Sequence, residues 1–332
     1  MTERSGPLVS VVLPTYGRPD YLVKAVRSVA TQTYDPLELV VVDDCSPQPV
    51  EPQLSNVSRD GLERFEVRRH AQNLGANAAR NTGIAAAKGE FVAFLDDDDQ
   101  WYPEKIRRQV STFDEAPDGT GVVYTGSQFV DEHDRPVGVS VRDLSGDITR
   151  ELLCGASVGS FTRLMVRRNL LERVGRLDES LPGWQDRDLN IRLSRFCRYE
   201  PVPEPLVIHR RGTHTQIGDD YEGKRDVAYP EFVEKHRPLA ATFGPDVERR
   251  FLAVQTLALA KSALTNGYTR AARRHAVEAL GHDPTYVEAY VYLLFTLDSG
   301  LYRVAKRVKR TAERALGSRQ TDGSDELDSA AR

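Results

Sequence analysis

Long apolar runs are missing from this sequence. Its 332 residues contain no uninterrupted apolar stretch of 18 or more, the length that a helix needs to cross a bilayer. The two most apolar segments, 251–264 and 287–297, are interrupted by Gln255, Lys261 and Glu288. The first ten residues, MTERSGPLVS, have no charged stretch followed by an apolar core. We therefore expect a cytoplasmic protein without a membrane span or a secretion signal.

Cysteine is scarce, and two common glycine-rich phosphate-binding motifs are absent. The three cysteines, at 45, 154 and 197, form neither a disulfide framework nor a zinc-binding pattern, which fits a reducing compartment. No G-x-G-x-x-G follows the first predicted strand, and no G-x-x-x-x-G-K-[ST] occurs anywhere. Dehydrogenases and P-loop ATPases are therefore disfavoured. Without such a motif, a diphosphate ligand would have to be held by a cation and by basic side chains.

An excess of positive charge is also absent. The chain has 45 basic and 49 acidic side chains, a net charge of -4, which argues against nucleic acid as the main partner. Residues 1–236 hold 30 basic and 38 acidic side chains, net -8, whereas residues 237–317 hold 13 and 7, net +6. This shift predicts a domain boundary near residue 237. The polar tail 318–332 is expected to be disordered.

Strand and helix patterns alternate along the first hundred residues. Short β-branched runs predict strands over 8–13, 37–42, 65–69 and 91–95, and helical spacing predicts helices over 21–31 and 76–87. Nearly unbroken apolar strands that alternate with helices indicate a parallel sheet covered on both faces. We therefore predict an α/β fold. Further along, we expect helices over 103–113 and 186–196 and strands over 121–125 and 161–166.

Polar residues follow three of the predicted strands at the point where each strand ends. These are Pro14-Thr15-Tyr16 after the first, Asp43-Asp44 after the second, and Asp96-Asp97-Asp98-Asp99 after the fourth. Parallel strands place their carboxyl ends at one edge of a sheet, where open α/β sheets bind ligands. We therefore expect these residues to converge on one crevice.

The acidic run 96–99 is the strongest chemical signal. In an extended segment Asp96 and Asp98 would point the same way, and a hard divalent cation would relieve the repulsion among four carboxylates. A solvated acidic loop is the alternative, but the position at the end of a buried strand favours a metal site. Asp43 or Asp44 could accept a hydrogen bond from a base N–H or a ribose hydroxyl, or could simply form a turn.

The C-terminal part is expected to be helical. Residues 246–316 have helical spacing with breaks at Gly267, at Asp283-Pro284 and at Gly300, and 267–289 resembles one tetratricopeptide unit. One unit is not an array, so we expect helical hairpins docked on the main domain. The segment 301–316 combines apolar positions at helical spacing with six basic side chains. It could lie on an anionic membrane or simply expose a solvated basic face.

Four motifs in order resemble family-2 glycosyltransferases of the GT-A fold, the large inverting group that uses nucleotide-activated sugars. They are VSVVLPTYGR, LVVVDDCS, NLGANAARNTGIAAAKGEFVAFLDDDD and GWQDRDLNIRL. The resemblance covers about residues 7–216. It implies a glycosyltransferase domain over 1–236, with a nucleotide-binding half over about 7–100 and an acceptor half over about 100–236. The helical extension would then cover 237–317.

The resemblance also implies roles for individual residues. Asp186 would be the general base that deprotonates the acceptor, and Trp184 would stack on a sugar. Asp98, in the family's Asp-x-Asp arrangement, would bind Mn²⁺ or Mg²⁺. The nucleotide sugar would contact Pro14, Thr15, Tyr16, Asp43, Asp44, Arg80, Asp96 and Asp97, with Asp44 holding the base, commonly uracil, and Asp96 facing the ribose.

Two parts of this assignment have alternatives. The family usually has Glu-Asp where this chain has Gln185-Asp186; Asp186 could instead cap a helix, and Asp188 is a rival carboxylate. In the stretch HRRGTH, His214 or Arg211 could close over the diphosphate or add a metal ligand, as in many relatives, or the stretch could be an exposed basic loop.

The expected activity is a metal-assisted transfer of one sugar to an acceptor hydroxyl with inversion, and a UDP-sugar is the expected donor. Processive relatives have a Gln-x-x-Arg-Trp motif that is missing here, which favours transfer of a single sugar by a hexosyltransferase-type enzyme. The acceptor would be a glycan or a lipid-linked molecule in glycan, polysaccharide or glycoprotein biosynthesis, with peripheral membrane attachment through 301–316 as one option. A sugar nucleotidyltransferase and a non-catalytic scaffold that binds nucleotide sugars are the alternatives.

Overall fold

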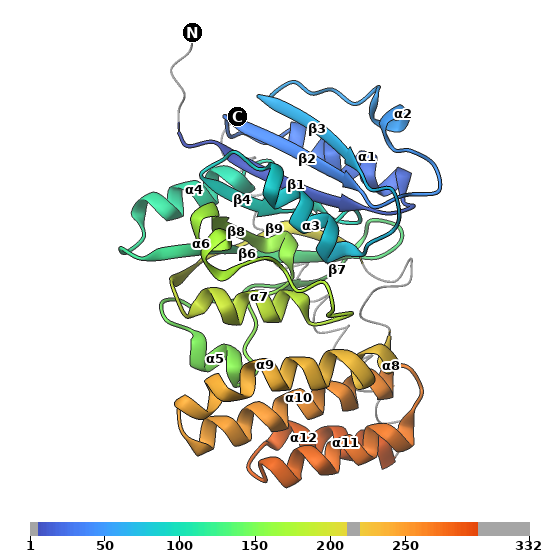
Figure 1. Cartoon of the computed structure of the whole chain (residues 1–332), viewed down its shortest axis with the longest axis vertical. Helices are drawn as coiled ribbons and strands as arrows, with labels where there is room; N and C mark the ends of the chain where they lie inside the picture. The colour runs from blue at the N-terminus through green and yellow to red at the C-terminus, as the bar shows by residue number, and fades with distance from the viewer. Residues whose placement is uncertain (1–5, 211–219, 298–332) are drawn as a thin grey trace, which may run out of the picture.

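The computed structural model describes residues 6–210 and 220–297. Within these ranges a nine-stranded mixed sheet is flanked by helices, and a group of helices is stacked at one end of the molecule (Figure 1). The predicted α/β class with a helical C-terminal region is therefore confirmed. The expected helix 301–316, its break at Gly300 and the tail 318–332 lie outside the described residues.

Four parallel strands form the first half of the sheet, in the order β3-β2-β1-β4. Val9 on β1 pairs with Leu37 on β2 and with Phe91 on β4, so the three strands run in register and end at the same edge. The predicted strands and helices of this half are present. Their bounds are β1 Val9–Thr15, α1 Pro19–Ala30, β2 Leu37–Asp43, α2 Glu51–Leu54, β3 Arg64–Arg69, α3 Ala76–Ala86 and β4 Phe91–Phe94.

The second half of the sheet is mixed and continues the order as β4-β8-β6-β9-β5, with β7 paired to β6. Strand β8 is antiparallel to both β4 and β6, so the strand direction reverses beside β4. The bounds are β5 Gln100–Trp101, α4 Lys105–Glu115, β6 Thr120–Val130, β7 Pro136–Ser140, α5 Thr149–Leu153, η1 Phe161–Arg163, β8 Leu164–Arg167, α6 Arg168–Val174, α7 Gln185–Ser194 and β9 Arg198–Arg210.

The sequence did not predict β9, although it is the longest strand described. Its segment contains Pro201, Pro203 and Pro205, and proline is normally confined to edges and irregular positions of a sheet because it cannot donate to the ladder. The parallel pairing of β9 with β6 shifts register between Thr125 and Ser127, beside these prolines. This strand brings His209 beside the acidic turn after β4.

Helices cover both faces of the sheet (Figure 1). The inner side of α1 buries the predicted apolar residues Leu22, Ala25, Val26 and Val29 completely. On the other face α3 lies against β1 at Gly83, where a Cβ atom would stand 2.3 Å from Cγ1 of Val12. Only glycine allows this close approach. It fixes α3, and with it Arg80, at the carboxyl edge of the sheet.

The C-terminal helices form a separate layer below the sheet (Figure 1). Helices α10, α11 and α12 are separated near Gly267 and near Asp283-Pro284, as predicted. The expected boundary at 236/237 falls inside α9, so the helical part begins earlier, at α8; the division into domains stays a prediction, as does the likeness to a tetratricopeptide unit. The bounds are α8 Tyr221–Gly223, the π-helical turn η3 Lys224–Ala228, α9 Tyr229–Thr242, α10 Pro245–Thr265, α11 Thr269–His282 and α12 Val287–Leu297.

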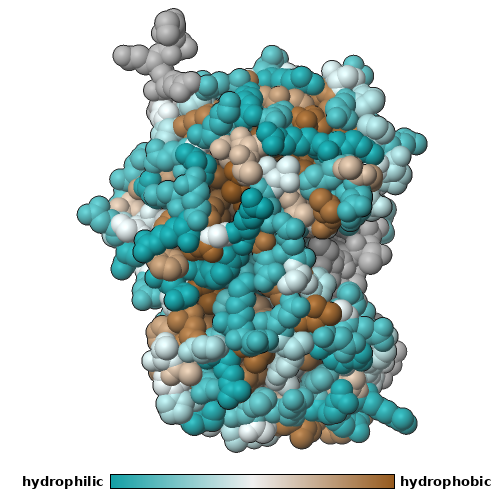
Figure 2. All heavy atoms as spheres, viewed as in Figure 1, coloured by the Kyte–Doolittle hydropathy of each residue, from teal (hydrophilic) through white to brown (hydrophobic). Residues whose placement is uncertain are grey.

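On the face shown in Figure 2, hydrophilic side chains predominate and apolar ones occur in separate groups. Among the residues that the structure describes, no helix is both long enough and apolar enough to cross a membrane.

Candidate active site

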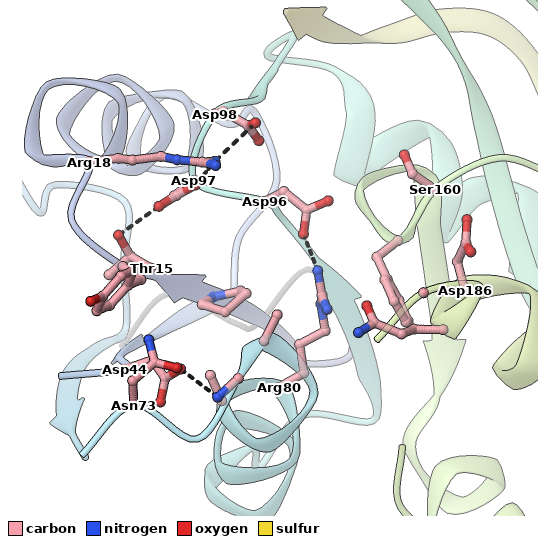
Figure 3. Close-up of a pocket in the computed structure, with 18 of the residues that line it drawn as sticks. Thr15, Arg18, Asp44, Asn73, Arg80, Asp96, Asp97, Asp98, Ser160 and Asp186 are labelled. Carbon is pink, nitrogen blue, oxygen red and sulfur yellow. Dashed lines mark hydrogen bonds and ion pairs between the residues drawn. The ribbon is translucent and has the colours of Figure 1, made fainter. Parts of the chain in front are cut away.

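A cavity of about 680 Å³ opens at the carboxyl ends of β1, β2 and β4 and extends to the start of α7 (Figure 3). Residues that are far apart in the sequence meet there, including Thr15, Asp44 and Asp186. These residues meet at the edge of the sheet, beside the place where the strand direction reverses between β4 and β8. Of the predicted site residues, the cavity is lined by Pro14, Thr15, Tyr16, Asp44, Arg80, Asp96, Asp97, Asp98, Trp184 and Asp186.

The acidic run forms a tight turn and not the extended segment that we expected. The Asp99 backbone N–H donates to the Asp96 carbonyl at 3.1 Å, so strand alternation does not govern these side chains. Asp98 faces Arg18 at 3.2 Å, and Asp96 faces Arg80 (Figure 3). Both carboxylates still line the cavity, but each has a cationic partner.

Asp97 joins the acidic turn to the end of β1. Its carboxylate accepts a hydrogen bond from the Thr15 hydroxyl at 2.8 Å and contacts Arg18 at 3.2 Å. Burial raises the pKa of Asp97 to about 6, while the positive charge of Arg18 opposes this shift. Arg18 therefore serves two carboxylates at once. Arg18 is the last residue of the first motif, VSVVLPTYGR, but the resemblance implied no role for it.

Arg80 connects α3 with the acidic turn. Its Nη2 lies 2.6 Å from Oδ1 of Asp96, and its guanidinium lies 4.2 Å from the centre of the Phe161 ring. The side chain is buried except where it meets the cavity. A planar cation that is stacked and ion-paired in this way is held in one orientation. It supplies a fixed positive charge beside Asp96.

Asp44 organises the loop between β3 and α3. Its carboxylate accepts hydrogen bonds from the backbone N–H groups of Leu74 at 2.9 Å and Gly75 at 2.8 Å, and it lies 2.7 Å from Nδ1 of His70. The other ring nitrogen of His70 lies 2.9 Å from the Thr82 hydroxyl. Asp44 thus lines the cavity and also fixes the shape of one wall.

Asp43 does not line the cavity, contrary to our expectation. Asp43 is the last residue of β2 and is fully buried, away from the cavity lining. Its carboxylate is ion-paired with Arg69 and accepts a hydrogen bond from the Ser46 backbone N–H at 2.8 Å. We therefore assign Asp43 to the turn after β2 and not to ligand binding.

Asp186 lies in the first turn of α7, across the cavity from Asp44. Trp184 is the residue that caps this helix, in the left-handed conformation with φ 60°, so Asp186 does not serve as the N-cap. The Arg187 backbone N–H donates to its carboxylate at 2.9 Å. Burial raises the pKa of Asp186, against the lowering effect of the Arg187 charge. A carboxylate with a raised pKa is a stronger base.

The rival carboxylate, Asp188, faces away from the cavity. It is buried and accepts from Nε of Arg192 at 2.9 Å, and it pairs with Lys235 and His236 on α9. Burial alone would raise the pKa of Asp188, but the hydrogen bond from His236 and the positive charge of Arg192 hold it well below its usual range. Asp188 is therefore a structural anion.

His209 and Lys224 also line the cavity, and neither was assigned from the sequence. His209 at the end of β9 contacts the Asp99 carboxylate at 3.0 Å, and Lys224 lies where a Cβ on Gly183 would touch it at 3.4 Å. Burial lowers the pKa of His209, but the adjacent carboxylate of Asp99 more than offsets this and leaves it raised. The motif HRRGTH pointed to this region, but our interpretation chose His214 and Arg211, which lie outside the described residues.

The cavity offers oxygen ligands for a hard cation. Asp96 and Asp98 both line it with carboxylate oxygens, the donor type that Mg²⁺ and Mn²⁺ prefer, and such ions take much of their coordination from water and substrate phosphate. In the described ranges, no three or more His, Cys, Asp or Glu side chains are grouped as a complete metal site. Asp96 and Asp98 would supply two oxygen ligands, and a bound phosphate would have to supply others.

Sequence comparison identifies glycosyltransferases among the relatives. An uncharacterized glycosyltransferase of Rickettsia bellii is 31% identical over 218 residues, which cover 64% of this chain and 31% of that protein. One of Rickettsia typhi is 29% identical over 227 residues, 70% of its length. The putative teichuronic acid biosynthesis glycosyltransferase TuaG of Bacillus subtilis is 39% identical over 111 residues, 31% of this chain and 41% of TuaG. The chain spans about a third of the length of the first of these.

Solved structures share the fold. Staphylococcus aureus TarS 1–349 in complex with UDP-GlcNAc superposes with a TM-score of 0.55 at 19% identity, over 88% of this chain and 92% of that one. A mannosyltransferase from Pyrobaculum calidifontis in complex with GDP-Man and Mn²⁺ gives 0.53 at 19% identity, over 95% and 85%. These likenesses confirm the predicted GT-A fold class. Residues 10–175, half of the chain, match the model of glycosyl transferase family 2, and the chain therefore belongs to this family of glycosyltransferases.

Proposed function

We propose that this glycosyltransferase moves a single sugar from a nucleoside diphosphate sugar to an acceptor hydroxyl, with a divalent cation and with inversion at the anomeric carbon. The observation that carries the proposal is one shared space: the Asp96–Asp98 turn, two arginines and Asp186 all line the same cavity (Figure 3). A diphosphate needs cationic surroundings and an acceptor needs a base. This cavity has both.

The donor would lie over the ends of β1 and β2. Tyr16 is half-exposed at the rim and Asp44 lines the wall below it, so a base and ribose have an aromatic surface and a carboxylate acceptor within reach. Arg18 and Arg80 flank the acidic turn and would face the diphosphate. A UDP-sugar is our proposed donor, and the UDP-GlcNAc complex of the structurally similar TarS supports it.

Asp98, with Asp96 beside it, would hold Mn²⁺ or Mg²⁺. A bound cation of this kind neutralises the charge that develops on a departing diphosphate. The Mn²⁺ complex of the mannosyltransferase with the same fold supports this part of the proposal. Arg18 contacts both Asp97 and Asp98, so it would keep the turn in place while the donor enters.

Asp186 would act as the general base from the other side of the cavity. Its carboxylate would take the proton of the acceptor hydroxyl while the acceptor oxygen bonds to the anomeric carbon and the bond to the diphosphate oxygen breaks. Attack from the side opposite the diphosphate inverts that carbon. Trp184 lines the same side and would contact the acceptor sugar. A glycan or lipid-linked acceptor is proposed, in keeping with the name of TuaG.

A panel of nucleotide sugars tests the proposal. Each donor is added with Mn²⁺, and the melting temperature and the released phosphate product are measured, since a ligand that binds only the folded state raises its stability. We expect one donor to stabilise the protein and to release nucleoside diphosphate once an acceptor is supplied, with a product of inverted anomeric configuration by NMR. Release of pyrophosphate would instead identify a nucleotidyltransferase, and binding without turnover over an acceptor panel would favour a scaffold.

A further inference from the structure

On the side away from the cavity, helix α7 is contacted by side chains of α9 in the helical region. Oδ1 of Asp188 lies 2.9 Å from Nε2 of His236 and 2.8 Å from Nζ of Lys235. Asp188 and His236 are both buried, with 1% and 3% of their surface exposed. The contact is therefore a buried, charge-assisted one between two helices, and such contacts depend strongly on geometry.

An aromatic contact holds the beginning of α7. The Phe232 ring, fully buried on α9, lies edge-on to Trp184 at 5.5 Å and lies 4.6 Å from the His236 ring. Trp184 has φ 60°, a conformation that costs a bulky residue free energy and persists only where the surroundings impose it. Phe232 and Tyr229, both on α9, pack against the Trp184 ring and can impose this conformation.

The loop that leads into α7 is held from both sides. Lys235 on α9 also binds the Asp178 carboxylate at 2.8 Å. From the nucleotide-binding half, Asn81 on α3 makes two hydrogen bonds with the backbone of Leu177, at 3.0 and 2.8 Å. Residues 177–188 thus connect the two parts of the molecule, and Asp186 lies between the held points at Trp184 and Asp188.

We propose that α9 sets the position of α7, with His236 as a positioning residue that keeps Asp186 directed into the cavity through Asp188. The inference rests on the proposed role of Asp186 as the base. A general base works only within hydrogen-bond distance of its proton, and a misplacement of about 1 Å can cost roughly 10²-fold in rate. The helical region is then part of the catalytic unit and not a separate docking module.

The chemistry of the His236–Asp188 contact suggests a matched pair of variants. Burial lowers the pKa of His236, although Asp188 opposes this, so the neutral ring donates its Nε2 proton to the carboxylate. Glutamine has an Nε2 donor at a similar reach, whereas leucine fills the space without a donor. Arg237 on the same helix offers a control, because it pairs with Glu248 on α10 and not with α7.

The experiment compares His236→Leu, His236→Gln and Arg237→Gln in the full chain by transfer kinetics and by donor binding. For His236→Leu we expect kcat to fall about 10- to 100-fold, with the donor Kd within twofold of the wild type. His236→Gln should retain most of kcat, and Arg237→Gln should change neither. A folded His236→Leu protein with unchanged kcat would overturn the proposal, and so would equal losses in kcat and donor affinity. Phe232→Leu, a second variant, removes the aromatic contact with Trp184. We expect it to lower kcat and to leave the donor Kd unchanged, as in His236→Leu.

Hydrogen exchange separates this proposal from the proposed function. In His236→Leu we expect faster amide exchange over 183–190 and unchanged exchange over α3, which can be measured without any substrate. If the wild type transfers no sugar, the proposed function fails, while the exchange pattern still decides whether α9 holds α7. Unchanged exchange over 183–190 would refute the contact's positioning role.

Discussion

The Nη2 atom of Arg80 lies 2.6 Å from Oδ1 of Asp96, and the same guanidinium covers the Phe161 ring. This contact joins α3 to the turn after β4 at the edge of the cavity. It gives the cavity a cation whose direction is fixed by both stacking and ion pairing. The donor's diphosphate would meet it together with Arg18.

Arg80→Lys should weaken donor binding. Lysine keeps the charge but loses the planar fork and the stacking on Phe161, so we expect the donor KM to rise about tenfold, a loss of about 1.4 kcal/mol. Steady-state kinetics and titration of the donor measure this. Arg59→Lys is the matched control, because Arg59 stacks on Phe65 at 4.3 Å and neither residue lines the cavity. An equal effect of both variants would refute a specific role for Arg80.

Asp186→Asn should abolish transfer but spare the donor. The amide cannot take the acceptor proton, and loss of a general base typically costs about 10²- to 10⁴-fold in rate. We expect kcat to fall within that range while the donor Kd stays unchanged. Asp60→Asn is the control, because Asp60 is an exposed carboxylate that accepts a hydrogen bond from the Ser58 hydroxyl and does not line the cavity. Full activity in Asp186→Asn would transfer the base role to another group.

The pH profile should report the raised pKa of Asp186. Burial raises this pKa against the opposing charge of Arg187, so the carboxyl becomes protonated, and unable to accept a proton, at a higher pH than an ordinary aspartate. We expect the acidic limb of kcat/KM to lie above about pH 4, the usual range of aspartate. A limb at or below that pH would show that Asp186 is not the group that titrates.

Asp188→Asn should change how stability depends on pH. The pKa of Asp188 is lowered in the folded state, so this carboxylate contributes stability above the unfolded pKa of 3.8 and loses it progressively as the pH falls below that value. Urea unfolding between about pH 5 and 3 should therefore have a shallower pH slope in the variant than in the wild type. At pH 7 the variant should lose about 3 kcal/mol, because it removes the carboxylate that faces the largely buried Arg192 and His236 side chains. Parallel slopes would contradict the contact.

Gly83→Ala should destabilise the fold. The new Cβ would stand 2.3 Å from Cγ1 of Val12, and overpacking of this kind costs about 1–3 kcal/mol. Gly281→Ala, in α11, has no atom within 4 Å of its Cβ position and should stabilise by up to about 1 kcal/mol, since alanine favours helix. Unfolding free energies in urea measure both. A stable Gly83→Ala protein would mean that α3 can move away from β1.

The sequence predicted the parts of the site that follow from strand direction. Thr15, Asp44 and the Asp96–Asp98 turn come together because β1, β2 and β4 are parallel and end at one edge. Asp43, the last residue of β2, pairs with Arg69, whereas Asp44, the next residue, lines the cavity. The local sequence does not predict which of these two neighbours faces the cavity.

The remaining parts depend on contacts between distant segments. His209 reaches the site only because the proline-rich β9 pairs with β6, and it meets Asp99 across 110 positions of the chain. The tight turn at 96–99 replaces the extended segment because the Asp99 N–H bonds to the Asp96 carbonyl. Likewise, Asp188 could be separated from Asp186 only after α9 was seen to supply Lys235 and His236.

Calorimetric titration of a UDP-sugar into the wild type and Asp98→Ala, with Mn²⁺ or with EDTA, tests the central claim most directly. Asp98 lines the cavity and is not part of the hydrophobic core, so its removal should leave the fold intact. We predict that the wild type binds the donor with Mn²⁺, that EDTA abolishes the binding, and that Asp98→Ala binds at least tenfold more weakly, whereas the exposed-site variant Asp114→Ala binds like the wild type. Equal affinity in Asp98→Ala and the wild type, or no binding of any nucleotide sugar by the wild type with Mn²⁺, would contradict the account.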